Sequence, residues 1–313
     1  MITLSPSGKQ FGTHQHASIL EAGLAAGIPL PYRCSNGSCG DCRARVLGGQ
    51  TEAISHHDYV LSHAEKNANV VLLCCHRALG NVEIEVTEAR SVEDIPRQQL
   101  NTRVCHTEFD NNTLIVRLKI LRGKALWYLA GQYATLSIPG QPLRTMPIAS
   151  CPCETGYLEF HLPPDAAELQ QAITALPKRE RIVVDGPHGN FTIDDAELES
   201  HHHVLIAGDQ QFAVIKPMIE HIIATGLEPL CTLIRITSSP YKHNLCRSWD
   251  DAFDRFHYHS INDATALPDV LPGSTLPITA YVSATTNLQH VLDTLQQVPA
   301  ISKVIADTDA GHC

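Results

Sequence analysis

Apolar and polar residues alternate over short segments in the first ninety residues, a pattern that indicates half-buried strands. Strands are expected at 2–4, around Phe11, at 44–47 and at 82–86, with a turn at Gly48-Gly49. Between the strand around Phe11 and the strand at 44–47, residues 18–27 have the spacing of a short amphipathic helix with Ser18 as its N-cap. This part of the chain therefore predicts a small sheet that packs on one helix.

The polar stretch 91–99 interrupts this periodicity, and we place a linker at 91–100. The following part is rich in alternating segments, at 114–120, 133–138 and 181–185. Regular short strands with turn signals between them are typical of a small antiparallel barrel. We therefore expect a barrel domain over 101–197.

The last part of the chain alternates apolar strand-like runs with helical periodicity. Residues 203–208 predict a buried strand, 215–223 a helix and 232–236 the next strand; 279–283, 288–297 and 304–306 repeat the order. This is the pattern of a parallel sheet covered by helices, expected over 198–313. The histidines at 201–203 are expected at a solvated strand entry. The chain as a whole is predicted to be multidomain, with α+β and α/β parts.

Three thiols stand out in the first domain because Cys34, Cys39 and Cys42 have C-x4-C-x2-C spacing, the ligand pattern of a plant-type [2Fe-2S] cluster. Gly37 and Gly40 permit unusual backbone angles between the thiols. A zinc site normally has paired short spacings, which this pattern lacks. A disulfide is disfavoured because nothing in the sequence suggests export. An iron-sulfur site is the interpretation that the spacing favours.

The fourth ligand is expected about thirty residues later, in the apolar run 70–76, which offers adjacent thiols at Cys74 and Cys75. Consecutive strand residues face opposite sides, so only one of the two would point at the cluster. The segment Leu72-Leu73-Cys74 resembles plant-type [2Fe-2S] ferredoxins, in which the ligand directly follows a Leu-Leu pair, and this resemblance points to Cys74. The predicted ligands are therefore Cys34, Cys39, Cys42 and Cys74.

Composition narrows the functional classes. The 313 residues carry a net charge of −10, which gives nucleic-acid binding no electrostatic support. No basic and apolar leader and no run of membrane-spanning length is present, so a cytoplasmic protein with no membrane span is expected. Seven of the eleven cysteines lie outside the predicted cluster and are expected to be core or incidental thiols. Among them, Cys151-Pro152-Cys153 is too closely spaced for a metal pair and is assigned no chemistry.

The first ninety residues resemble plant-type [2Fe-2S] ferredoxins. The matching motifs are Leu20-Glu21-Ala22, Pro31-Tyr32-Arg33-Cys34, Gly37-Ser38-Cys39-Gly40-Asp41-Cys42 and Leu72-Leu73-Cys74. The resemblance implies a β-grasp domain over 1–90, with the cluster near one edge under a thin loop.

Residues 101–197 resemble the flavin-binding barrel of the ferredoxin-NADP reductase family. The matching motifs are Gly131-Gln132-Tyr133, Arg144 with Pro147-Ile148-Ala149-Ser150, and Gly186-Pro187-His188-Gly189-Asn190-Phe191. The resemblance implies that Arg144 would pair with the FAD pyrophosphate. The family's stacking aromatic and its hydroxyl are replaced by Met146 and Pro147, and two carboxylates stand in the segment 163–168, where the family has a glycine and serine turn. We therefore expect at most substoichiometric FAD.

Residues 198–313 resemble the nucleotide-binding domain of the same family. Two of that family's motifs differ: Gly208-Asp209-Gln210-Gln211 replaces its Gly-Gly-Thr-Gly turn, and Ser283-Ala284-Thr285-Thr286 replaces its Cys-Gly-Pro-Pro. Asp209 would place a negative charge beside a phosphate, and the glutamines would fill space that glycines leave open. We therefore expect a degenerate dinucleotide site and no direct oxidation of NAD(P)H.

The expected function is one-electron transfer through the cluster to or from a redox partner, such as an oxygenase or another iron-sulfur or flavin enzyme. In this interpretation no residue is assigned a catalytic role, and activity as an NAD(P)H reductase is doubtful. One alternative is a functional FAD- and NAD(P)H-dependent reductase component of an oxygenase. Another is a scaffold or sensor whose cluster has no role in electron transfer.

Overall fold

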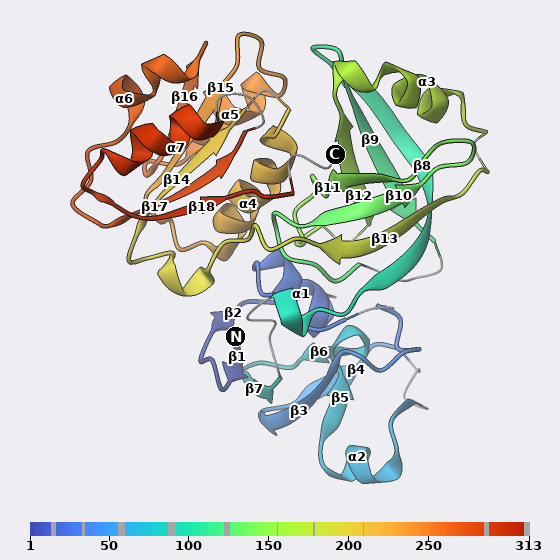
Figure 1. Ribbon diagram of the computed structural model, residues 1–313. Helices are drawn as coiled ribbons and strands as arrows, with labels where there is room; N and C mark the ends of the chain where they lie inside the picture. Colours follow the sequence, from blue (N-terminus) through green and yellow to red (C-terminus); the bar gives the residue numbers. More distant parts are fainter. Residues whose placement is uncertain are drawn as a thin grey trace.

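The computed structural model describes residues 1–13, 17–32, 35–55, 60–86, 92–121, 126–154, 156–177, 179–208, 210–284 and 288–309. Three large sheets, one of them accompanied by a two-stranded sheet, divide these residues into three parts (Figure 1). The N-terminal sheet lies at the bottom of the view, an antiparallel sheet at the upper right and a parallel sheet at the upper left. The multidomain α+β and α/β fold class is therefore confirmed.

The N-terminal part is a mixed sheet with strand order β2-β1-β7-β3-β5, accompanied by the pair β4-β6. Its strands are β1 (Ile2–Ser5), β2 (Gln10–Phe11), β3 (Arg43–Gly48), β4 (Thr51–Ala53), β5 (Val70–Leu72), β6 (His76–Ala78) and β7 (Val82–Glu85), and its helices are α1 (Ile19–Ala25) and α2 (His63–Asn67). Strands β1 and β7 run parallel, and β1 pairs with β2 as an antiparallel hairpin. Ser18 caps α1, as predicted, by accepting a hydrogen bond from the Glu21 amide. The apolar face of α1 and the inward residues of the sheet form one core.

The second part is an antiparallel sheet with strand order β11-β10-β13-β8-β9-β12. Its elements are β8 (Gln98–Asp110), β9 (Thr113–Ile120), β10 (Tyr133–Ser137), β11 (Arg144–Pro147), β12 (Tyr157–Leu162), α3 (Ala167–Ala175) and β13 (Ile182–His188). Just after β11, the Ala149 amide donates to the Glu159 carbonyl of β12 at 2.8 Å, which ties the two outer strands together. The sheet is thereby curled into the expected small barrel around an apolar core.

The third part is a parallel sheet with strand order β16-β15-β14-β17-β18. Its elements are β14 (His202–Ala207), α4 (Phe212–Thr225), β15 (Cys231–Ile236), α5 (His243–Ala252), β16 (Phe256–Ile261), α6 (Leu267–Val270), β17 (Ile278–Ser283), α7 (Leu288–Gln296) and β18 (Ile301–Ala306). Strands β14 and β17 are buried along their whole length because helices cover the sheet.

One expectation for this sheet is wrong. His202 and His203 do not lie at a solvated strand entry but are 3% and 0% exposed in β14. The reason is that β14 is a central strand, paired with β15 on one side and β17 on the other. His202 shares a hydrogen bond of 2.9 Å with the Thr232 hydroxyl, so the sheet accommodates its polar ring.

The three parts are joined by specific contacts. The Tyr32 hydroxyl of the N-terminal part donates to the Leu126 carbonyl of the barrel part at 3.2 Å. Gly27, with φ of +73°, lies so close to α4 that a Cβ atom there would be 3.3 Å from the Thr225 nitrogen. Gly131 of the barrel part also approaches α4, since a Cβ atom there would be 3.2 Å from the Met218 sulfur, and the same atom would clash with the Phe191 carbonyl oxygen of the barrel part. These glycines permit backbones from different parts of the chain to touch.

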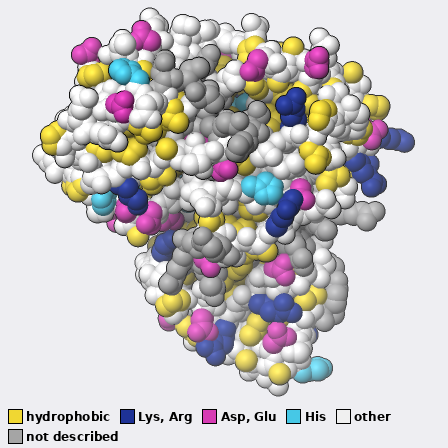
Figure 2. Space-filling view, viewed as in Figure 1, with side chains coloured by type: hydrophobic (Ala, Val, Ile, Leu, Met, Phe, Trp, Pro, Cys, Tyr) yellow, Lys and Arg dark blue, Asp and Glu magenta, His cyan; other side chains and the backbone are white. Residues whose placement is uncertain are grey.

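The segment expected as linker contains regular structure. Strand β8 begins at Gln98, inside the segment expected as linker, and a short 3-10 turn at Val92–Asp94 precedes it. We keep 1–90, 101–197 and 198–313 as proposed domains. None of the helices within the described residues is long and apolar enough to cross a bilayer. Acidic and basic side chains are scattered over the face seen in Figure 2 rather than separated by sign.

Candidate functional site

The loop that carries Cys39 and Cys42, called the cysteine loop below, joins α1 to β3. Gly37 and Gly40 adopt φ values of +83° and +82°, which confirms the expected unusual backbone. Asn36 accepts hydrogen bonds from the Ser38 amide and hydroxyl, and the Asp41 amide donates to the Cys39 sulfur at 3.4 Å. Amide donors of this kind stabilise sulfur ligands.

Arg43 holds the loop against the rest of the domain. Its guanidinium donates to the carbonyl of Gly40 at 2.8 Å and to that of Val60 at 3.1 Å. It also pairs with the Glu65 carboxylate at 2.9 Å. Hydrogen bonds from the hydroxyl and amide of Ser62, and then the charge of Arg43, lower the pKa of Glu65, which favours the ionised carboxylate that pairs with Arg43.

Pairing of β3 with β5 brings two predicted ligands together. Arg43 is opposite Leu72, and the Leu73 amide donates to the Cys42 carbonyl at 2.9 Å. The next residue, Cys74, places its sulfur 3.3 Å from that of Cys42. The hydrogen bond with Cys42 and burial raise the pKa of Cys74 well above its usual range. Two sulfurs this close would both be thiolates only beside a cation such as iron, so the donor set fits a cluster.

The expectation that strand alternation separates Cys74 from Cys75 is wrong. Residues Leu73–Cys75 form a 3-10 turn rather than a strand, so their side chains do not alternate between two faces. The sulfur of Cys75 accepts a hydrogen bond from the Ser55 hydroxyl at 3.3 Å and lies 3.6 Å from that of Cys74. The proximity of Cys42 favours Cys74, which stays a prediction. Cys34 lies outside the described residues, and among those described no group of three or more metal-ligand side chains is assembled.

A second candidate site is a cavity of about 470 Å³ between the barrel and the α/β part. It brings together several positions that the sequence singled out: Arg144, Met146, Pro147, Pro163, Asp165, Gln210 and Gln211. Asp209, Thr285 and Thr286 lie outside the described residues. Segments that are far apart in the sequence therefore meet at this cavity.

The chemistry of this cavity fits FAD incompletely. Arg144 is exposed and offers a cation for a pyrophosphate, whereas Asp165 on the same cavity wall opposes an anion. Met146 is 6% exposed and supplies no aromatic plane. The Gln211 side chain covers Gly208, where its Oε1 would be 2.7 Å from an added Cβ. It thus occupies the space above the end of β14 that a dinucleotide-binding turn leaves open.

The end of β17 is closed by buried hydrogen bonds. Asp307, which is 4% exposed, accepts from the Tyr133 hydroxyl at 2.5 Å and from the Ser283 hydroxyl at 2.7 Å. Ser283 belongs to the segment that replaces the family's Cys-Gly-Pro-Pro. Its hydroxyl therefore has a structural partner that links β17, β18 and the barrel.

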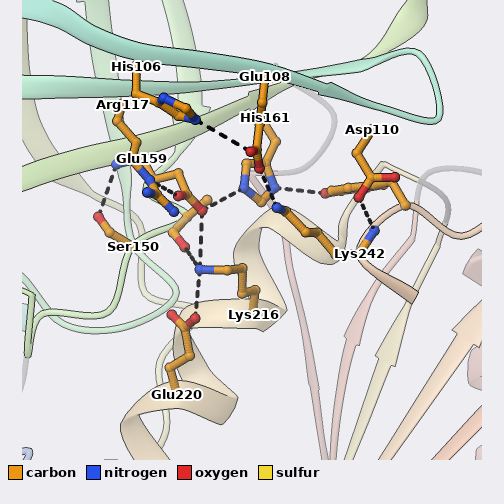
Figure 3. A network of polar contacts seen from close by, with 12 residues as sticks. His106, Glu108, Asp110, Arg117, Ser150, Glu159, His161, Lys216, Glu220 and Lys242 are labelled. Atoms are coloured by element: carbon orange, nitrogen blue, oxygen red, sulfur yellow. Dashed lines mark hydrogen bonds and ion pairs between the residues drawn. The ribbon is translucent and has the colours of Figure 1, made fainter. Parts of the chain in front are cut away.

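A buried polar network that the sequence pattern did not predict lies between β12 and α4 (Figure 3). At its centre, the Glu159 carboxylate contacts Arg117 at 2.8 Å, His161 at 3.0 Å and Lys216 at 3.2 Å. Burial alone would raise the pKa of Glu159, but the hydrogen bond with His161 and the charge of Lys216 lower it well below its usual range. Glu159 is therefore held as an anion inside the protein.

The network joins the barrel to the α/β part. Glu159 and His161 lie on β12, whereas Lys216 lies on α4 and also contacts Glu220 at 2.7 Å. Burial lowers the pKa of His161, so the ring is neutral, donates from Nε2 to Glu159 and accepts at Nδ1 from Tyr241. The signal in the sequence was a glutamate and a histidine two positions apart in an otherwise apolar strand, facing the same side.

A second missed feature is the disulfide between Cys151 and Cys153, which lies in the connection from β11 to β12. The expectation that this pair is incidental and has no chemistry is therefore wrong. A tight turn at Pro152, closed by a hydrogen bond from the Glu154 amide to the Cys151 carbonyl, brings the two side chains together.

Comparison with known proteins agrees with this architecture. The family described as 2Fe-2S iron-sulfur cluster binding domain matches residues 2–79. The CDP-6-deoxy-L-threo-D-glycero-4-hexulose-3-dehydrase reductase of Yersinia pestis is 28% identical over 225 residues, which are 71% of this chain and 67% of that protein. Terephthalate 1,2-dioxygenase reductase component 2 of Comamonas is 26% identical over 259 residues, 80% of this chain and 75% of that protein.

Among solved structures, the Amycolatopsis cytochrome P450 reductase GcoB has a TM-score of 0.59 at 20% identity and covers 98% of this chain and 97% of its own. A likeness at this identity shows the fold. The chain thus consists of an N-terminal 2Fe-2S ferredoxin domain joined to a module with the fold of the ferredoxin-NADP reductases.

Proposed function

We propose that the chain is an electron-transfer reductase component that carries electrons through a [2Fe-2S] cluster to a partner protein. The observation that supports it is a cluster-binding domain packed directly against a reductase-fold module, with the sulfurs of Cys42 and Cys74 side by side. By analogy with the relatives, we propose an oxygenase as the partner and a cytoplasmic location.

In this proposal Cys34, Cys39, Cys42 and Cys74 hold the cluster, which supplies one-electron transfer when bound. The hydrogen bond from Arg43 to the Gly40 carbonyl keeps the loop in place, and the Asp41 amide stabilises charge on the Cys39 sulfur. Burial of Cys42 and Cys74 keeps water from their side of the site.

The source of the electrons separates two forms of the proposal. The relatives favour a complete reductase that accepts electrons from NAD(P)H, with FAD in the cavity beside Arg144. A flavin there would convert two-electron to one-electron transfer. The position of Gln211 over Gly208 instead favours a carrier that another reductase loads.

The test is anaerobic reduction of the purified full-length protein, followed by the visible absorbance of the cluster. Bleaching by NADH or NADPH alone would establish the complete reductase. Bleaching only after addition of an independent flavin reductase would establish the carrier. A cluster that neither route reduces reversibly would refute electron transfer and leave the scaffold or sensor alternative.

A further inference from the structure

The disulfide between Cys151 and Cys153 lies at the junction of the ferredoxin domain and the reductase-like module. A cavity of about 330 Å³ occupies this junction. Cys153 and Pro152 line it from the barrel side, and Ile28 and Tyr32 line it from the ferredoxin domain. The pair therefore borders a space large enough to admit a small molecule.

The two sulfurs differ in access. Cys151 is 1% exposed, whereas Cys153 is only partly buried and faces the cavity. A thiol that enters this space meets the Cys153 sulfur first, and access is one of the factors that decide which sulfur of a disulfide is attacked.

A hydrogen bond from the backbone favours Cys151 as the sulfur that leaves when the disulfide is attacked. The Cys153 amide donates a hydrogen bond to the Cys151 sulfur at 3.2 Å. An N–H donor stabilises negative charge, and a better stabilised thiolate leaves faster. The bond encloses only one intervening residue, so it constrains the unfolded chain little. A purely structural role is therefore poorly supported.

We propose that Cys151 and Cys153 form a reversible dithiol–disulfide couple that exchanges with low-molecular-weight thiols through the junction cavity, with Cys153 as the attacked sulfur. A thiolate bonds to the Cys153 sulfur, the bond to Cys151 breaks, and Cys151 departs as a thiolate that takes a proton from water. A second thiolate then attacks the small-molecule sulfur of this mixed disulfide, which releases Cys153 as a thiolate that is protonated in turn. Two small thiols are oxidised to their disulfide, and the protein gains two electrons and two protons.

Reduction would release the turn that forms one wall of the junction. The two residues before it are anchored by other contacts: the Ala149 carbonyl accepts from Lys216 at 3.0 Å, and the Ser150 carbonyl accepts from Tyr128 at 2.9 Å. The expected change is therefore confined to 151–154 and to the cavity wall.

The test uses full-length protein equilibrated anaerobically in glutathione buffers from oxidised to reduced, quenched with acid, alkylated and analysed by peptide mass spectrometry. Cys151 and Cys153 are expected to convert together from disulfide to two thiols, with glutathione trapped on Cys153 at intermediate ratios. Buried Cys231 and Cys246 should remain thiols throughout, and exposed Cys105 reports access of glutathione. A pair that stays free in the most oxidised buffer, or stays joined in the most reduced one, overturns the proposal.

Single variants test the direction of attack. C151S leaves Cys153 at the cavity and should form a mixed disulfide with oxidised glutathione about tenfold faster than C153S, which leaves only the buried Cys151. Equal or reversed rates overturn the assignment. If either variant loses the visible absorbance of the cluster, the site of glutathione trapping in the wild-type protein decides instead: Cys153 supports the proposal and Cys151 refutes it.

Discussion

The cysteine loop and the reductase-like cavity differ in how well their side chains match the chemistry of their folds. In the loop, the sulfurs of Cys42 and Cys74 meet at 3.3 Å. In the cavity, Arg144 shares the wall with Asp165 and Met146. Both parts have a buried apolar core that holds the fold, whereas ligand binding depends on a few residues at strand ends and in loops. A fold can therefore persist while its ligand contacts change.

The largest effect is expected in the loop. Cys42→Ser and Cys74→Ser should abolish the visible absorbance of the cluster, because each removes a thiolate ligand. Cys75→Ser should retain it, as should the control Cys105→Ser at an exposed thiol. Bleaching in Cys75→Ser with colour kept in Cys74→Ser would show that the fourth ligand was wrongly chosen.

The next effect concerns the network between the barrel and the α/β part. Glu159→Ala should lower the free energy of unfolding by about 3–5 kcal/mol, because it leaves the buried Lys216 ammonium with one carboxylate fewer. Urea unfolding followed by tryptophan fluorescence measures this change. The matched control, Glu85→Ala, breaks the exposed pair with Arg45 in the ferredoxin domain and should cost less than about 1 kcal/mol. Equal losses in both variants would refute the role of burial.

A smaller effect depends on pH and belongs to the parallel sheet. Burial, and then the charge of His203, lower the pKa of His202 to about 4. The unfolded chain then binds a proton more readily than the folded chain, so the contribution of His202 is complete above pH 6.5 and is lost as pH falls to 4. The expected loss is on the order of 3 kcal/mol, because each unit of pKa difference corresponds to about 1.4 kcal/mol.

His202→Gln provides the matched variant for this titration, because an amide can still bond the Thr232 hydroxyl but does not titrate. Its free energy of unfolding should fall less steeply than that of the wild-type protein between pH 6.5 and 4. Parallel curves for the two proteins would show that His202 does not contribute.

The smallest effect is expected from substitutions in the cavity, which should change FAD affinity and leave the fold intact. Arg144→Ala should weaken FAD binding by about 10- to 100-fold, the loss of one hydrogen-bonded charge pair, and leave the cluster spectrum unchanged. Asp165→Asn should strengthen it severalfold because a like charge is removed. FAD released by denaturation, measured by fluorescence, checks both changes. Stoichiometric FAD in the wild-type protein would contradict the expectation of weak binding, and insensitivity to both substitutions would place the flavin elsewhere.

Much of the fold could be predicted because local rules and tertiary structure agree. The capping box at Ser18, the positive φ of Gly37 and Gly40 and the buried run of β14 all have unambiguous local signals. The choice between Cys74 and Cys75 could not be derived in this way, since the chain leaves the strand at Leu72 and turns. The sequence pattern did not reveal that Glu159 and Lys216 would meet, because their contact joins residues far apart in the chain.

The close approach of Gly27 to Thr225 has a consequence for protein engineering. A ferredoxin domain taken from another protein would carry its own residue at the position of Gly27, and any side chain there would press on the backbone of α4. Exchange of this module should therefore succeed when the donor also has glycine at that position. Where it does not, a chimaera would need a compensating deletion or repacking around Thr225 to keep the electron carrier seated on its neighbour.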